Sequence, residues 1–434
     1  MVLSPNGAWF AAGLCALLLG AGPALCADDR PAPPADLWGR ANLLDEGGGW
    51  RAHLNQEGWQ PFSILTTDVL DNTSGGLRKG AANLTLLTAG TEADMQTLAG
   101  WDGATFRVSF NAVKGTHPNR NTGAFDDPTD YDAADEIRVA DLRLQQNLLD
   151  GQLTIKLGQA DASDDFGQGA NSSMFLNSAI VSQPVLYNQV LANRDAAMAV
   201  YPLNTPGLVV RLDPKGLPFY TISGIYLCDP GPDVSGNHGL DWRFGGGVEV
   251  MQEVGWHYRA APAAGTMAIG GFYNDGRFTN WNTGDTQRGI WGGYALVNQV
   301  LWQRAGADPA NPESSLAGFV AGAGAGPDSR TGPAFDYCAG LNWQGPLPGR
   351  KTDAASVAVL HTGFSPDYTR SAFNPNGPGL TPPGETVLEF TYQLAVTPWC
   401  NVQPDAQVIF HPADAGPGAR GTATVAGVRV VVTF

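Results

Sequence analysis

Apolar and polar residues alternate along most of this chain, and this alternation constrains the fold more than any other feature. Between residues 104 and 113, for example, Phe106 and Val108 alternate with Arg107 and Ser109. Successive side chains of a β-strand point to opposite faces, so each such segment has one apolar face and one polar face. The pattern therefore predicts strands that separate an apolar environment from a polar one.

About sixteen segments of roughly ten residues carry this alternation, and turn residues separate them. The segments lie near 62–70, 84–95, 104–113, 137–147, 152–159, 206–213, 217–227, 247–259, 266–275, 289–303, 315–324, 335–344, 355–364, 384–397, 400–411 and 422–434. Bacterial outer-membrane barrels use an even number of antiparallel strands of this kind. We therefore expect an all-β fold, a transmembrane antiparallel β-barrel of about 16 strands.

The connections between these segments fall into two classes. Short, turn-like connections lie at 150–151, 214–216, 261–265 and 397–398, and long polar connections lie at 114–136, 160–205, 228–246 and 365–383. A barrel with short periplasmic turns and long external loops predicts such a rhythm, whereas a soluble β-sandwich does not. We expect the longest connection, 160–205, to fold into the barrel and to narrow the pore.

The N-terminal residues divide the chain into three parts. Residues 1–27 have the pattern of a secretory signal peptide, because an apolar run precedes the small residues Cys26 and Ala27. Residues 28–61 are expected to form a Pro-rich periplasmic linker with a short helical segment. Residues 62–434 are then the transmembrane barrel domain.

The chain ends on an alternating strand whose apolar face carries Val428, Val430, Val432 and Phe434. A terminal aromatic residue on such a strand is the signal that the outer-membrane barrel assembly machinery reads. We expect Phe434 to be this assembly signal, and the apolar faces of the strands to contact outer-membrane lipid. The location predicted for the protein is therefore the bacterial outer membrane.

Composition excludes several classes of protein. The net charge of −16 argues against a nucleic-acid partner, because the phosphate backbone requires a basic surface. No interior apolar stretch is long enough for a transmembrane helix. The cysteines beyond residue 27 are Cys228, Cys338 and Cys400, which are too few and too scattered for a disulfide framework or a metal site. We expect no metal and no cofactor.

No motif of a known catalytic site is present. The chain lacks the nucleophile elbow, the zinc-binding His-Glu-x-x-His pattern, the phosphate loop and the dinucleotide fingerprint. An outer-membrane barrel enzyme is an alternative, but His257 and His361 have no evident serine and acid partners. We therefore expect a protein that is not an enzyme.

The polar faces of the strands supply the candidate pore-lining residues. A sugar pore needs polar walls, because each hydroxyl that loses water must regain a hydrogen-bond partner. Rows of charges of both signs supply such partners. The strand candidates are Glu92, Asp94, Arg107, Asp141, Arg143, Lys156, Glu249 and Glu253, and the loop candidates are Arg78, Lys79, Asp161, Asp164 and Asp165.

Other interpretations of these residues stay open. Arg78 and Lys79 would also suit a solvated turn, and Asp164-Asp165 would suit a helix cap or a calcium site. Arg143 and Glu253 are two charges that would suit mutual neutralisation inside the barrel. Aromatic residues at strand ends are more typical of interfacial girdles than of sugar platforms, and they include Trp256, Tyr258, Trp302 and Trp343.

Several segments together resemble the carbohydrate-selective porin (OprB) family. They are Ser74–Gly80, Leu98–Trp101, Gly158–Asp161, Asp164–Phe166, Met174–Ser178, Tyr201–Gly207 and Glu253–Trp256, followed by a C-terminal run at Glu385–Tyr392, Val396–Trp399, Gln403–Gln407 and Phe410–Pro412. The resemblance implies a sixteen-stranded barrel, a monomer or a homotrimer, that lets small sugars (mono- or disaccharides) diffuse passively into the periplasm. A general diffusion pore, or a pore for another solute, is the alternative.

Overall fold

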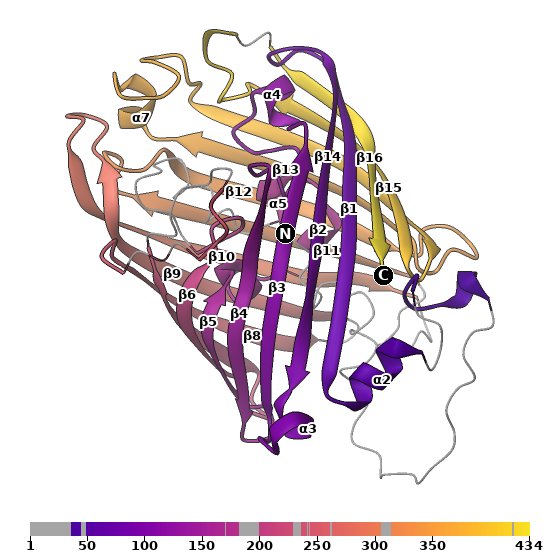
Figure 1. Ribbon diagram of the computed structural model, residues 1–434. Helices are drawn as coiled ribbons and strands as arrows, with labels where there is room; N and C mark the ends of the chain where they lie inside the picture. Colours follow the sequence, from indigo (N-terminus) through magenta and orange to yellow (C-terminus); the bar gives the residue numbers. More distant parts are fainter. Residues whose placement is uncertain are drawn as a thin grey trace.

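The computed structural model describes residues 36–44, 49–169, 171–181, 199–228, 236–240, 242, 244–260, 263–304, 314–418 and 421–434, so the expected signal peptide lies outside the described residues. The strands form one closed antiparallel barrel in which each strand pairs with the next in sequence and β1 pairs with β16 (Figure 1). The expected fold class, an all-β antiparallel barrel of 16 strands, is confirmed.

The strands are β1 (Trp59–Ser74), β2 (Gly80–Asp94), β3 (Ala104–Gly115), β4 (Glu136–Leu148), β5 (Leu153–Ala160), β6 (Thr205–Leu212), β7 (Phe219–Leu227), β8 (Val248–Ala260), β9 (Ala263–Thr279), β10 (Thr286–Gln303), β11 (Ser315–Gly326), β12 (Pro333–Gln344), β13 (Ala354–Phe364), β14 (Gly384–Thr397), β15 (Cys400–Phe410) and β16 (Ala423–Thr433). The helices are α2 (Trp50–Gln56), α3 (Met95–Ala99), α4 (Asn119–Thr122), α5 (Ser178–Val181) and α7 (Pro366–Arg370), with short 3-10 turns at Leu37–Gly39, Ala162–Asp164, Ser172–Met174 and Gly416–Gly418. None of the helices in the described residues is long and apolar enough to span a membrane.

Each of the sixteen predicted segments overlaps one observed strand, and the largest differences are at strand ends. The barrel begins at Trp59, inside the expected linker 28–61, because Trp59 already pairs with Ala93 of β2. Residues 37–39 and 50–56 of that segment form a 3-10 turn and the helix α2.

Strand faces divide as the alternation predicts. On the outside, Phe110 of β3 is 44% exposed and Ile269 of β9 is 65% exposed. On the inside, Arg107 of β3 is 2% exposed and Glu249 of β8 is wholly buried. These charged side chains therefore point into the barrel, and the outward faces are apolar, which suits lipid outside.

The two rims of the barrel differ. One rim, here called the terminus rim, is where β1 begins and β16 ends, and α2 and α3 lie there (Figure 1). The opposite rim, here called the loop rim, carries α4 and α7 (Figure 1). All four connections that were expected to be long leave from the loop rim, although the connections at 75–79, 280–285 and 327–332 on the same rim are short.

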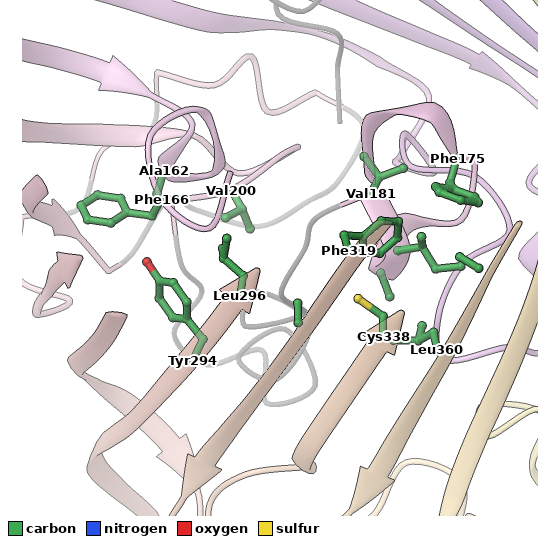
Figure 2. Close-up of a cluster of buried hydrophobic side chains, with 14 of the residues drawn as sticks. Ala162, Phe166, Phe175, Val181, Val200, Tyr294, Leu296, Phe319, Cys338 and Leu360 are labelled. Atoms are coloured by element: carbon green, nitrogen blue, oxygen red, sulfur yellow. The ribbon is translucent and has the colours of Figure 1, made fainter. Parts of the chain in front are cut away.

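The inner face is less uniformly polar than the alternation suggests. Leu296, Phe319, Leu360 and Val387 all point inward and are at most 3% exposed. They belong to one apolar cluster with side chains from the connection between β5 and β6 (Figure 2). Part of the inner wall is therefore apolar, and the connection between β5 and β6 packs against this part and buries its side chains.

Candidate pore lining and inner loop

A row of charges of alternating sign crosses the inner faces of β2, β3 and β4. Arg107 binds Glu92 through one guanidinium nitrogen, and its Nε lies 2.9 Å from Oδ2 of Asp141. Arg143 Nε lies 3.7 Å from the other oxygen of Asp141. The register explains the row, because Arg107 lies opposite Glu92 on one side and opposite Arg143 on the other.

A β-bulge brings Asp141 into this row. The register between β3 and β4 shifts at Ser109 and Phe110, so that both Ala140 and Asp141 are buried. Such a bulge adds one residue to a strand and reverses the faces of the residues that follow it. Without it, Asp141 and Arg143 would point toward the outside of the barrel. Asp141 also accepts a hydrogen bond of 2.6 Å from Ser109 Oγ.

The connection between β5 and β6 joins the row. We call its residues 161–169 and 171–181 the inner loop, because they contact the inward faces of the strands. Lys156 Nζ lies 2.6 Å from Asp165 Oδ1, and Arg143 Nη1 lies 3.9 Å from Asp164 Oδ2. Burial and the neighbouring Asp161 carboxylate raise the pKa of Asp164 to about 7, although Arg143 opposes this shift.

Asp161 has a local role at the start of the inner loop. Its carboxylate accepts hydrogen bonds from the backbone N–H of Ser163 at 2.8 Å and from the backbone N–H of Tyr201 at 2.9 Å. It therefore caps the 3-10 turn Ala162–Asp164 and holds the end of the connection near its start. Of the three loop aspartates, Asp164 and Asp165 face the cations of the wall, and Asp161 serves as the cap.

Three candidates lie at the rims of the barrel. Asp94 is at the terminus rim, where it caps α3 by accepting hydrogen bonds from Gln96 N at 3.0 Å and Thr97 Oγ1 at 2.7 Å. Arg78 is exposed at the loop rim, and its Nε donates a 2.7 Å hydrogen bond to Asn121 Oδ1. Lys79 is exposed in the same turn.

The two glutamates of β8 differ sharply in their contacts. Glu253 accepts hydrogen bonds from Gly167 N at 2.8 Å, Tyr220 Oη at 2.9 Å and Tyr294 Oη at 2.5 Å. Glu249 is wholly buried, and in the part of the chain that the structure describes no hydrogen bond reaches either of its carboxylate oxygens. Glu253 therefore links the inner loop to the wall, whereas Glu249 does not.

The inner loop runs along the wall rather than outside the barrel. In chain order, its contacts reach Arg143 and Lys156 on β4 and β5, Glu253 on β8, Asn298 and Asn342 on β10 and β12, and finally Gln403 on β15 and Glu389 on β14. Apolar contacts follow the same path, and Figure 2 shows Phe166 and Phe175 of the inner loop near Tyr294 and Phe319 of the wall.

Alternation alone did not reveal a second charged cluster at the seam where β1 meets β16. Arg429 donates two hydrogen bonds of 2.8 Å to the two oxygens of Asp68, and a third of 2.6 Å to Asp130 in the connection 116–135. Thr129 Oγ1 donates a 2.6 Å hydrogen bond to Asp68. The polar face of each strand was a signal for Asp68 and Arg429, but nothing in the sequence placed them side by side.

The C-terminus lies beside the start of the barrel. Phe434 N donates a 2.9 Å hydrogen bond to Ser63 O of β1, and Arg51 of α2 donates a 2.6 Å hydrogen bond to Phe434 O. Of the aromatic residues expected at strand ends, Trp256, Trp302 and Trp343 are 46–48% exposed near the terminus rim, and Tyr258 is half-buried. They are placed as girdle residues would be.

Cysteines and acidic residues are the side chains here that could bind a metal ion. Cys228 and Cys338 are buried, Cys400 is half-buried, and all three are free thiols. Among the described residues, no group of three or more His, Cys, Asp or Glu side chains is arranged to hold a metal ion.

Comparison with known proteins assigns the family. The family model described as "Carbohydrate-selective porin, OprB family" matches residues 78–434. A solved structure of Pseudomonas putida OprB at high pH is similar to this chain, with a TM-score of 0.80 and 19% identity over 91% of this chain and 99% of that one. The low-pH structure of the same protein has a TM-score of 0.58 and 16% identity over the same shares. Among curated proteins, no sequence matches this chain. Because the family model covers most of the barrel, the chain belongs to the carbohydrate-selective porin, OprB family, and is a porin of the bacterial outer membrane.

Proposed function

We propose that small sugars, mono- or disaccharides, diffuse passively past the charged row formed by Glu92, Arg107, Asp141, Arg143 and Lys156. The observation that carries this proposal is the arrangement of the row, in which charges of both signs alternate on the wall and the carboxylates of Asp164 and Asp165 face it. Diffusion of this kind needs no cofactor and no covalent chemistry.

Alternating charges suit sugars for a physical reason. A sugar hydroxyl both donates and accepts hydrogen bonds, so it is best met by neighbouring cations and carboxylates. An unmet hydroxyl would cost about 1–3 kcal/mol. Because the opposite charges lie within one row, the row does not strongly favour the passage of cations over anions or of anions over cations.

The exposure of the side chains suggests which of them a sugar would touch. The side chains of Glu92, Asp164 and Lys156 are 29%, 16% and 15% exposed, whereas those of Arg107 and Arg143 are at most 4% exposed. We propose that the first three contact the solute and that the two arginines hold them in place. The inner loop narrows the passage at this level.

Partners and orientation follow from the same geometry. We propose that the terminus rim faces the periplasm, that lipid covers the apolar outer faces, and that the barrel assembly machinery reads the last strand through Phe434. A monomer and a homotrimer both keep these outer faces away from water. Light scattering on the detergent-solubilised protein distinguishes the two assemblies by mass.

Conductance in planar bilayers tests the proposal. We expect stepwise currents that glucose-type sugars block, and we expect weaker block in Lys156→Ala. Lys215→Ala is the matched control, because Lys215 is an exposed lysine in the turn between β6 and β7 at the terminus rim. Currents that no sugar blocks would leave only the general diffusion pore, and the absence of any current would contradict the porin function.

A further inference from the structure

Two buried glutamates of the barrel wall accept hydrogen bonds from the backbone of the inner loop. Glu389 of β14 accepts from Leu176 N at 2.6 Å and from Asn177 N at 3.1 Å, and it is wholly buried. Glu253 of β8 accepts from Gly167 N at 2.8 Å and is 1% exposed. The sequence indicated Glu253 as a pore-lining candidate or a partner of Arg143, and it indicated Glu389 only as part of the segment Glu385–Tyr392.

The loop needs these acceptors because of its own conformation. Leu176 and Asn177 lie between the 3-10 turn Ser172–Met174 and α5, so no helix or strand supplies partners for their backbone N–H groups. A buried N–H group without a partner is costly, and a carboxylate is a strong acceptor that has no donor of its own. Each glutamate therefore accepts hydrogen bonds only when the backbone N–H groups of the loop point toward it.

Uncharged side chains hold the loop between these points. Gln403 donates a 2.7 Å hydrogen bond to Met174 O, and Asn342 donates a hydrogen bond to Asn171 O. Asn177 Oδ1 accepts a hydrogen bond of 3.2 Å from Ala179 N, and this contact lies at the first turn of α5. The loop is thus attached along its length, and the carboxylates of Glu253 and Glu389 receive its backbone N–H groups at two separated points.

The two glutamates lie far apart on the barrel. In the strand order, β14 is the sixth strand after β8, so Glu253 and Glu389 attach the loop to different sectors of the wall. A segment held at two separated sectors has a defined path between them. That path also decides how far Asp164 and Asp165, which precede Gly167 in the chain, project toward Arg143 and Lys156.

We propose that Glu253 and Glu389 are positioning residues of the pore, which set the width of the passage and its selectivity for sugars by holding the inner loop against the wall. The inference rests on the proposed function, since it assigns to these residues the geometry of the same passage. Neither glutamate needs to touch the solute.

The test compares Glu389→Gln and Glu253→Gln with the wild-type protein in planar bilayers. An amide keeps the size of the side chain but replaces one acceptor oxygen by a donor, which in Glu389→Gln must face one of the two loop N–H groups. In Glu253→Gln the donor can face the Tyr220 hydroxyl, so Gly167 N loses the carboxylate charge and the smaller effect is expected there. We expect a larger and noisier single-channel current and sugar block that is about two- to tenfold weaker, as the loss of about one hydrogen bond predicts.

Asp353→Asn is the matched control. Asp353 is a wholly buried carboxylate that accepts a backbone hydrogen bond of 3.1 Å from Ala395 N, but its partners Arg350 and Tyr392 belong to the terminus rim. This variant should lower the stability of the barrel and leave conductance and sugar block unchanged. Heat-modifiable migration in SDS gels shows for each variant that the barrel has formed.

A second measurement reports on the loop without any current. In a background in which the native cysteines are replaced, Met174→Cys places a thiol in the partly buried part of the inner loop. A membrane-impermeant thiol reagent should label this cysteine several-fold faster when Glu389→Gln is added, and at the unchanged rate when Asp353→Asn is added.

The outcomes separate the inference from the proposed function. If the wild-type protein shows no sugar-blocked current, the proposed function is wrong and the inference falls with it. If the wild-type current is blocked by sugars but Glu389→Gln and Glu253→Gln keep wild-type current, block and labelling, only the inference is wrong. If one variant does not form a barrel, the other decides the question by the same criteria.

Discussion

Replacement of Arg429 tests the most highly charged contact of the barrel seam. Arg429 is 7% exposed and lies between Asp68, which is wholly buried, and Asp130, which is 8% exposed. It donates two hydrogen bonds to Asp68 and one to Asp130, and its guanidinium carbon lies 5.1 Å from the ring of Tyr131. The variant Arg429→Met keeps much of the apolar stem and removes the charge.

The expected loss of stability follows from what the variant leaves behind. Asp68 and Asp130 would both lose the guanidinium that binds them, and removal of one partner from a buried ion pair costs about 3–5 kcal/mol. We expect the free energy of unfolding to fall by about 4 kcal/mol, a shift of roughly a thousandfold in the unfolding equilibrium. Arg429→Lys should lose less, because it keeps the charge and loses only the bidentate geometry.

Urea unfolding in lipid vesicles, followed by tryptophan fluorescence, measures these differences. The double variant Asp68→Asn with Arg429→Met should recover part of the loss, since it removes one of the two carboxylates that lose the guanidinium. A change of less than about 1 kcal/mol in Arg429→Met would show that this ion pair does not hold the seam. A double variant no more stable than Arg429→Met would contradict the charge argument even if the single loss were large.

Three further predictions concern other parts of the chain. His117 lies in the loop-rim connection 116–135, and its hydrogen bond to Asp132 raises its pKa above 6.5. This contact therefore contributes stability below pH 6.5, which is lost as pH rises through the raised pKa. NMR titration of Asp132→Asn should show a lower His117 pKa than in the wild-type protein. Arg51→Ala removes the hydrogen bond to Phe434 O and should cost about 1–3 kcal/mol in the urea assay. Val254 points outward and is 47% exposed, so Val254→Arg places a charge against lipid and should lower the free energy of unfolding in vesicles by about 2–4 kcal/mol. An unchanged unfolding midpoint would contradict lipid contact at this position.

Much of the candidate row was predictable because the information is local. Arg107 faces inward because its neighbours at the next positions are apolar, and two-residue periodicity needs no knowledge of the rest of the chain. Even the β-bulge left a trace, since Val139 and Leu142 are the outward residues on either side of it and are three positions apart. The same local pattern was uninformative for Asp94, which lies at a strand end where a helix cap competes with the lumen.

The apolar inward residues and the loop anchors were not predictable in this way. Leu360 points inward although alternation assigns apolar residues to the lipid face, and its burial depends on the inner loop that covers it. Glu389 looked like any polar-face residue of a strand, and its role depends on Leu176 and Asn177, more than two hundred positions earlier.

The sequence by itself determined the number of strands, the alternation of two faces along most of each strand and the family, because each of these depends on short-range periodicity or on motifs that keep their order along the chain. Tertiary structure decided which charges meet. Asp68 and Arg429 are 361 positions apart and become neighbours only when β1 pairs with β16. The path of the inner loop was likewise decided by acceptors on strands distant in sequence, since a loop without periodic structure takes its shape from the partners that its buried backbone groups find.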